Sequence, residues 1–152
     1  LPLRETYGVL KEIYEVPEAQ FKERMAFLNE VLELDSFITS PVRTLSLGQR
    51  MRADIAASML HNPKVLFLDE PTLGLDVLVR SDLWDLIRCL KGKITIILTT
   101  HYMEEAAALS DRIGIMKEGK LIALGTAGEL KQQAGKERFE EAFVAIVKGV
   151  EQ

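Results

Sequence analysis

Two short apolar segments, separated by one amphipathic segment, constrain the fold of this chain more than any other feature. The first is Val65-Leu66-Phe67-Leu68-Asp69, and the second runs from Ile94 to Thr100 and is rich in β-branched residues. Continuous apolar runs of this length are typical of strands that are covered on both faces, as in a parallel sheet. Residues 77–91 between them repeat apolar side chains at helical spacing. The order strand, helix, strand therefore predicts a parallel α/β sheet.

Helices are predicted before these strands. Residues 3–14 and 18–34 each carry an apolar stripe at three- and four-residue steps, with Pro17 between them. Residues 46–60 continue as a helix with one buried face. Asn62-Pro63 ends this helix, since a residue before proline is biased away from helical conformation.

The last third predicts smaller elements. Residues 103–109 fit a short helix, and residues 112–125 fit a hairpin around Glu118-Gly119. A helix follows to residue 134, and residues 136–149 form a last amphipathic helix. Core packing and a partner contact both remain open for that last helix.

Length and charge narrow the class of protein. A chain of 152 residues is long enough for one domain with a real core, with room for a small lobe. Its net charge of −4 disfavours a broad nucleic-acid interface, which needs an excess of lysine and arginine. One cysteine excludes an intramolecular disulfide framework. The longest apolar runs are far too short to cross a membrane.

Two adjacent carboxylates, Asp69 and Glu70, follow the first predicted strand. In open α/β sheets, ligands bind at the carboxyl ends of the strands. An acid placed there can hold Mg²⁺ through water, and a second acid can polarise an attacking water, as phosphoryl transfer requires. The same two residues also fit the start of a plain loop that Pro71 closes. Taken alone, they leave both interpretations open.

The segment Leu45-Ser46-Leu47-Gly48-Gln49-Arg50 lies at the start of the predicted helix 46–60. Ser46 and Gln49 fit a capping box. The free amides and positive dipole of a helix N-terminus favour phosphate, and Gly48 would let a phosphate approach the backbone. The simpler alternative is a capped helix without a ligand.

Two further polar residues stand next to predicted elements. His101 directly follows the second strand and would share a sheet edge with Glu70 if the strands are parallel, where a γ-phosphate or an attacking water would be in reach. A histidine at a strand end is also common as a structural residue. Asp76 ends the segment Leu73-Gly74-Leu75-Asp76 and is expected to cap the helix that follows.

In this order and separation, the segments resemble the nucleotide-binding subunit of ATP-binding cassette (ABC) transporters. Leu45 to Gln49 looks like the family signature LSGGQ, with Leu47 where the pattern has glycine. The strand ending at Asp69 resembles the Walker B strand, with Glu70 in the place of the catalytic glutamate.

The resemblance extends from Leu1 to about Leu130. Residues 73–76 look like the D-loop, and His101 looks like the switch histidine. The LSLGQR form, the stretch from Thr100 and the Leu-Gly-Thr stretch look most like exporter-type cassettes that serve separate membrane subunits.

The resemblance implies a partial P-loop NTPase (RecA-like) core with parallel strands flanked by helices, plus an α-helical subdomain. Two cassettes, in a homodimer or heterodimer, would sandwich two ATP molecules. Ser46, Leu47, Gly48 and Gln49 would bind the γ-phosphate of the nucleotide that the other subunit holds.

The remaining site residues also take their roles from the resemblance. Asp69 would bind Mg²⁺ through water, and Glu70 would be the general base. His101 would stabilise the γ-phosphate as the second catalytic residue, and Asp76 would cross the dimer interface.

We expect residues 1–60 to form the helical subdomain, 61–135 the second half of the ATPase core and 136–152 a C-terminal helix. The resemblance further implies a transmembrane permease partner, no nucleic acid, and a peripheral place on the cytoplasmic face of the cell membrane. The sequence does not indicate the transported substrate, which the membrane subunits largely select in this family.

The phosphate-binding loop G-x-x-x-x-G-K-[ST] of the family is not found. Residues 114–120 match its first seven positions, but Leu121 lacks a hydroxyl and the stretch lies in a predicted hairpin. This loop and the Q-loop precede the signature in the family, so we expect both upstream of Leu1 in a longer protein. We expect this chain alone to be inactive, with a strand edge or face exposed that favours self-association.

Two other functions remain as alternatives. One is a soluble ABC-type ATPase of DNA repair or translation, which the acidic charge and the lack of a long coiled coil disfavour. The other is a catalytically silent docking module.

Overall fold

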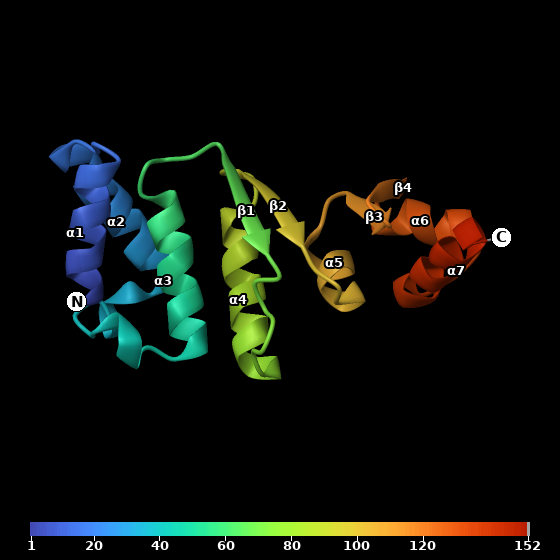
Figure 1. Ribbon diagram of the computed structural model, residues 1–152, viewed down its shortest axis with the longest axis horizontal. Coiled ribbons are helices and arrows are strands. Elements are labelled where there is room, and N and C mark those ends of the chain that lie inside the picture. The colour runs from blue at the N-terminus through green and yellow to red at the C-terminus, as the bar shows by residue number, and fades with distance from the viewer. Residues whose placement is uncertain (152) are drawn as a thin grey trace. The chain divides into compact units, whose positions relative to one another are not determined.

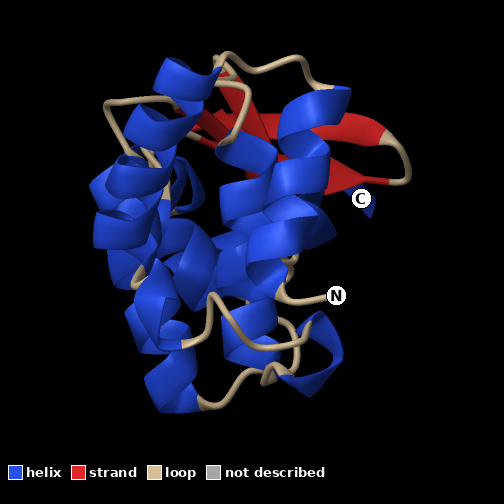
Figure 2. Ribbon diagram, turned by 90° about the vertical axis from the view of Figure 1, so that its left-hand side faces the viewer, coloured by secondary structure: helices blue, strands red, loops and turns tan. Residues whose placement is uncertain are grey.

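The computed structural model describes residues 1–151, and it divides into two compact units, residues 1–99 and the part from Thr100 onward (Figure 1). The first unit holds α1 (Leu3–Ile13), α2 (Glu18–Leu32), η1 (Leu34–Ser36), η2 (Val42–Thr44), α3 (Leu47–Met59), β1 (Val65–Asp69), α4 (Val77–Leu90) and β2 (Thr95–Thr99). The second holds α5 (Met103–Leu109), β3 (Ile113–Lys117), β4 (Lys120–Gly125), α6 (Ala127–Ala134) and α7 (Phe139–Glu151). Helices dominate, and the strands are short (Figure 2). The predicted helices and strands are confirmed to within a few residues.

A helical lobe begins the first unit, and α3 lies between α1 and α4 (Figure 1). The apolar stripes predicted for α1 and α2 contribute to the interior of this lobe, where Tyr7, Leu28 and Leu32 are buried. Two hydrogen bonds tie the first two helices to α3: Tyr7 Oη donates to Ala53 O at 3.0 Å, and Arg24 Nη2 donates to Met59 O at 3.1 Å. The lobe thereby fixes α3, whose first residues carry the signature-like segment.

The predicted strand–helix–strand segment is confirmed, because β1 and β2 pair in parallel with Val65 opposite Thr95 and Asp69 opposite Thr99. The connecting helix α4 buries Leu83, Ile87 and Leu90. Both strands therefore end at the same edge of the sheet, which places Asp69 beside Thr99.

The prediction that β1 is covered on both faces is wrong. Its side chains alternate between the faces, so Leu66 and Leu68 are buried while Phe67 is 71% exposed. Val65 and Ile97 are also exposed on the strand pair. The sheet containing β1 has two strands among the described residues, and its packing buries only one side of β1. The expectation of an exposed strand face is confirmed, and self-association stays a prediction.

The second unit has its own core beneath an antiparallel hairpin of β3 and β4. Glu118 and Gly119 both adopt positive φ (50° and 77°) at its tip, as tight hairpin turns require. The apparent phosphate-loop match at residues 114–120 therefore lies in a hairpin, as predicted.

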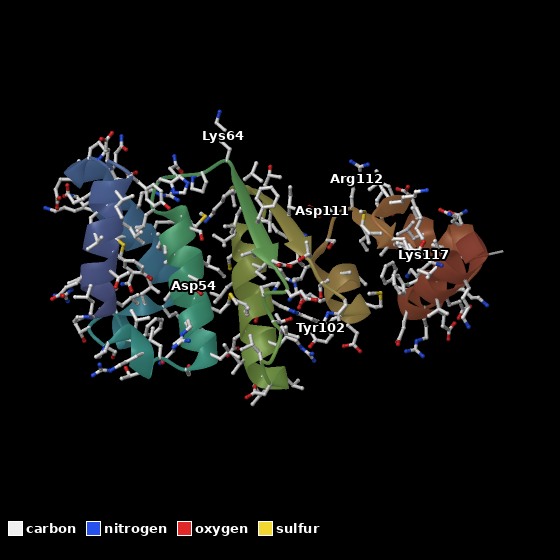
Figure 3. All side chains as sticks on the ribbon, in the orientation of Figure 1. Asp54, Lys64, Tyr102, Asp111, Arg112 and Lys117 are labelled. Atoms are coloured by element: carbon white, nitrogen blue, oxygen red, sulfur yellow. The ribbon has the colours of Figure 1, made fainter. Side chains whose placement is uncertain are left out.

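The last helix, α7, packs into this second core. Phe139 is buried there, and Phe143, Ile146 and Val147 are partly buried against it. Lys117 Nζ donates to Val147 O at 3.2 Å, which joins the hairpin to the helix (Lys117 is labelled in Figure 3). Of the two options that the sequence left open, core packing is observed. No helix in residues 1–151 is long and apolar enough to span a membrane.

Candidate functional site

The acid pair lies where β1 ends, and the adjacent strand holds it. Thr99 Oγ1 donates a hydrogen bond to Asp69 Oδ1. The Glu70 amide donates to Thr99 O at 2.8 Å and lies 3.3 Å from Thr99 Oγ1. The end of β2 therefore fixes both the Asp69 side chain and the Glu70 backbone.

Glu70 adopts a left-handed backbone conformation, with φ of 47°. Such a conformation costs a non-glycine residue on the order of 1–3 kcal/mol and persists where the surroundings impose it. Here the surroundings include the two Thr99 acceptors and the buried Pro71 and Thr72 that follow. Strained residues of this kind cluster at functional sites, and this one carries the carboxylate that the sequence singled out.

The donor set at this strand end suits Mg²⁺. Asp69 is exposed, so its second carboxylate oxygen can accept a hydrogen bond from a metal-bound water. No group of three or more His, Cys, Asp or Glu side chains within residues 1–151 forms a closed metal cage. A metal held here would therefore keep water and substrate oxygens as ligands, as Mg²⁺ does at phosphate sites.

The predicted capping box at the start of α3 is confirmed. The Gln49 amide donates to Ser46 Oγ at 3.2 Å, and the Ser46 amide donates to Gln49 Oε1 at 3.0 Å. The amides of Leu47 and Gly48, in the first turn of α3, have no intrahelical acceptor by helix geometry. The segment thus has the free donors and the dipole that favour an anion.

The signature-like segment packs against the start of α4 and the D-loop-like segment. A Cβ on Gly48 would lie 2.7 Å from Val79 Cγ1, and a Cβ on Gly74 would lie 3.3 Å from Leu47 Cδ2. Sequence reasoning connected Gly48 only with phosphate approach. The structure shows that Gly48 also permits the close approach of α3 to α4.

Replacing Gly48 with alanine tests this packing role. We expect Gly48→Ala to lower the free energy of unfolding by about 1–2 kcal/mol. Overpacking costs about 1–3 kcal/mol, and the higher helix propensity of alanine offsets up to about 1 kcal/mol of that cost. Gly8→Ala is the matched control within α1, where an added Cβ meets nothing within 4 Å, and it should stabilise by about 0.5–1 kcal/mol. Urea denaturation measures both.

The Gly48→Ala effect should depend on Val79. In a Val79→Ala background the clashing Cγ1 is absent, so Gly48→Ala should become neutral or stabilising there. Equal destabilisation in both backgrounds would show that the α3–α4 approach is not the cause.

Asp76 caps α4, as predicted: its Oδ1 accepts a hydrogen bond from the Val79 amide at 2.9 Å. Three apolar residues within three positions of Asp76 in the sequence are exposed: Leu73, Val77 and Leu78. The role of Asp76 across a dimer interface stays a prediction.

His101 belongs to the second unit, next to its first residue, Thr100. Its ring lies against the ring of Tyr102 at a tilt of 40°, with the ring centroids 4.5 Å apart (Tyr102 is labelled in Figure 3). The Tyr102 amide donates to Thr100 Oγ1 at 3.0 Å, just before α5 begins. The contact of His101 with a γ-phosphate stays a prediction.

The structure thus assembles two groups in the first unit. Asp69 and Glu70 meet Thr99 at the strand ends, and residues 46–49 meet Gly74 and Val79. Sequence reasoning missed Thr99 as a member of the first group. The available signal was a hydroxyl residue ending the second strand, at the same sheet edge as the acids.

Sequence comparisons match this chain to ATP-binding proteins of ABC transporters. The family model "ABC transporter" matches residues 3–73. The chain is 41% identical, over 90% of its length, to daunorubicin resistance ATP-binding protein DrrA3 of Streptomyces coeruleorubidus, and it covers 44% of that protein. It is 34% identical, over 97% of its length, to ABC transporter G family member 20 of Dictyostelium discoideum, of which it covers 20%.

Solved structures show the same fold. An ATP-binding subunit of an ABC transporter superposes with a TM-score of 0.80 at 27% identity, covering 97% of this chain and 62% of that one. The cbiO1 protein of Clostridium perfringens, part of the cbiONQ transporter complex, gives a TM-score of 0.70 at 32% identity, covering 78% and 48%.

The parallel strand pair with acids at its carboxyl end, flanked by helices, defines an α/β protein of the P-loop NTPase class. Within that class, the family match over residues 3–73 and the relatives named above make the chain similar to the ATP-binding proteins of ABC transporters. It spans less than half the length of the curated relatives described above.

Proposed function

We propose that this chain is the part of an exporter-type ABC cassette that carries the signature segment and the catalytic acids, and that it takes part in ATP hydrolysis coupled to transport. The observation that carries the proposal is the Asp69–Thr99–Glu70 cluster at the strand ends. The capped N-terminus of α3 offers a separate phosphate-binding segment, which we assign to the site of a partner cassette. Similarity to daunorubicin resistance ATP-binding proteins supports the exporter class.

In this proposal each residue has one task. Bound Mg²⁺ supplies charge neutralisation at the phosphates. Asp69 would hold the water ligands of a bound Mg²⁺ through its second carboxylate oxygen, and Glu70 would take the proton from the attacking water. His101 donates to the γ-phosphate of the same nucleotide.

The signature segment acts on a second nucleotide. Ser46, Leu47, Gly48 and Gln49 bind the γ-phosphate that a partner cassette holds, in a homodimer or heterodimer, and Asp76 lies at that dimer interface. A transmembrane permease subunit is the second partner, which places the cassette peripherally on the cytoplasmic face of the membrane. Residues 1–60 serve as the signature subdomain, 61–135 as the ATPase half and 136–152 as a C-terminal segment, of which residue 152 lies outside the described residues.

ATP turnover tests the proposal. The full-length gene product that contains this chain should hydrolyse Mg-ATP, and residues 1–152 alone should hydrolyse it negligibly. Co-purification of the full-length product with a membrane protein would support the transport role. Absence of ATP hydrolysis in the full-length product, or co-purification with nucleic acid instead, would overturn the proposal.

A further inference from the structure

We propose that Thr99 is a positioning residue that sets the Asp69 carboxylate and the Glu70 backbone for ATP hydrolysis. This inference rests on the proposed function, because it assigns a task within the same site. Neither the sequence motifs nor the comparisons assign a role to Thr99.

The threonine hydroxyl acts as donor and acceptor at once, using its single donor and one of its two acceptor sites. A hydroxyl has one donor and two acceptor sites. Thr99 Oγ1 donates to Asp69 Oδ1 and lies 3.3 Å from the Glu70 amide nitrogen, which also donates to Thr99 O at 2.8 Å. One side chain therefore contacts both members of the acid pair.

The contact restricts the Asp69 side chain. Asp69 is exposed at the end of β1, where a carboxylate without a partner would sample several rotamers. A hydrogen bond to an ionised acceptor is stronger than one between neutral groups. Holding Oδ1 leaves the other carboxylate oxygen for a metal-bound water, in one fixed orientation.

The contact also supports Glu70. Its left-handed backbone, with φ of 47°, persists only while neighbouring groups hold it. Thr99 O and Thr99 Oγ1 hold the Glu70 amide. The end of β2 therefore sets the direction in which the Glu70 side chain leaves the backbone.

Strand propensity alone does not account for these contacts. Thr95 lies on the same strand and the same face as Thr99, four residues earlier, but pairs with Val65 rather than with an acid. Valine matches threonine in shape and β-branching. A threonine-to-valine change at either position therefore removes only a hydroxyl, and Thr95→Val is the matched control.

The test has two arms. In residues 1–152, the ¹³C shift of the Asp69 carboxyl and the amide shift of Glu70 should move in Thr99→Val but not in Thr99→Ser or Thr95→Val. In the full-length product, Thr99→Val should lower kcat for Mg-ATP by about tenfold, since loss of a supporting hydrogen bond typically costs 10- to 100-fold. KM should stay within about twofold, and Thr99→Ser should restore kcat.

Each result decides between the two proposals. An unmoved Asp69 carboxyl shift in Thr99→Val, or equal losses of kcat in Thr99→Val and Thr95→Val, would overturn the role of Thr99 alone. An inactive wild-type product would overturn the proposed function and with it the catalytic role of Thr99. If Thr99→Val does not fold by circular dichroism, Thr99→Ala takes its place with the same expectations.

Discussion

Glu70→Gln in the full-length gene product is expected to slow Mg-ATP hydrolysis roughly 100- to 10,000-fold, the range for loss of a general base. Glutamine has nearly the same shape as glutamate but cannot accept a proton from water at neutral pH. Binding of ATP should persist, since the change leaves the capped helix and Asp69 in place. Steady-state turnover and equilibrium binding of a fluorescent ATP analogue measure the two effects separately.

The backbone of Glu70 requires a control with the same conformation. Glu15 also has a positive φ, 53°, and lies exposed in the same unit. Glu15→Gln should therefore leave turnover within about twofold, the spread that a change without a catalytic role produces. Turnover that survives Glu70→Gln would show that another group takes the proton.

Local sequence chemistry predicted much of the site. Ser46 with Gln49 forms the predicted capping box, and Asp76 caps α4, because both interactions lie within three residues along the chain. The position of Asp69 at a sheet edge followed from the apolar run that precedes it. Interactions of this range need no knowledge of tertiary packing.

Three features could not be predicted, because each depends on residues far apart in sequence. The contact of Thr99 with the acid pair needs the register of β1 on β2. The packing role of Gly48 needs the position of Val79. The sequence predicts an exposed strand face, but which side of β1 it is, and so the exposure of Phe67, depends on how the helices cover the sheet, which an apolar run cannot report.

Tyr7→Ala is expected to lower the free energy of unfolding by about 3–5 kcal/mol, as for other large aromatic truncations in a core. The Tyr7 side chain is 1% exposed, and its hydroxyl bonds Ala53 O on α3, the helix that begins with the signature segment. Tyr14 at the end of α1 is 48% exposed and is the matched control. Tyr14→Ala should cost less than about 1 kcal/mol in the same urea denaturation.

The Tyr7 hydroxyl can be separated from its ring by Tyr7→Phe, which should cost about 1–3 kcal/mol by leaving the Ala53 carbonyl without its donor. Burial raises the pKa of the Tyr7 phenol, and the negative charge of Asp54 adds to this shift (Asp54 is labelled in Figure 3). The unfolded phenol ionises near pH 10, whereas the folded phenol stays neutral to higher pH. Its stabilisation is therefore complete below about pH 10 and declines as the pH rises above it.

Tyr7→Phe should remove that part of the alkaline decline, because phenylalanine does not ionise in either state. The wild-type chain should accordingly lose stability more steeply than Tyr7→Phe between about pH 10 and 11.5. Parallel slopes for wild type and Tyr7→Phe would mean that this phenol ionises equally in the folded and unfolded chain. The phenol would then not be buried between α1 and α3 in solution.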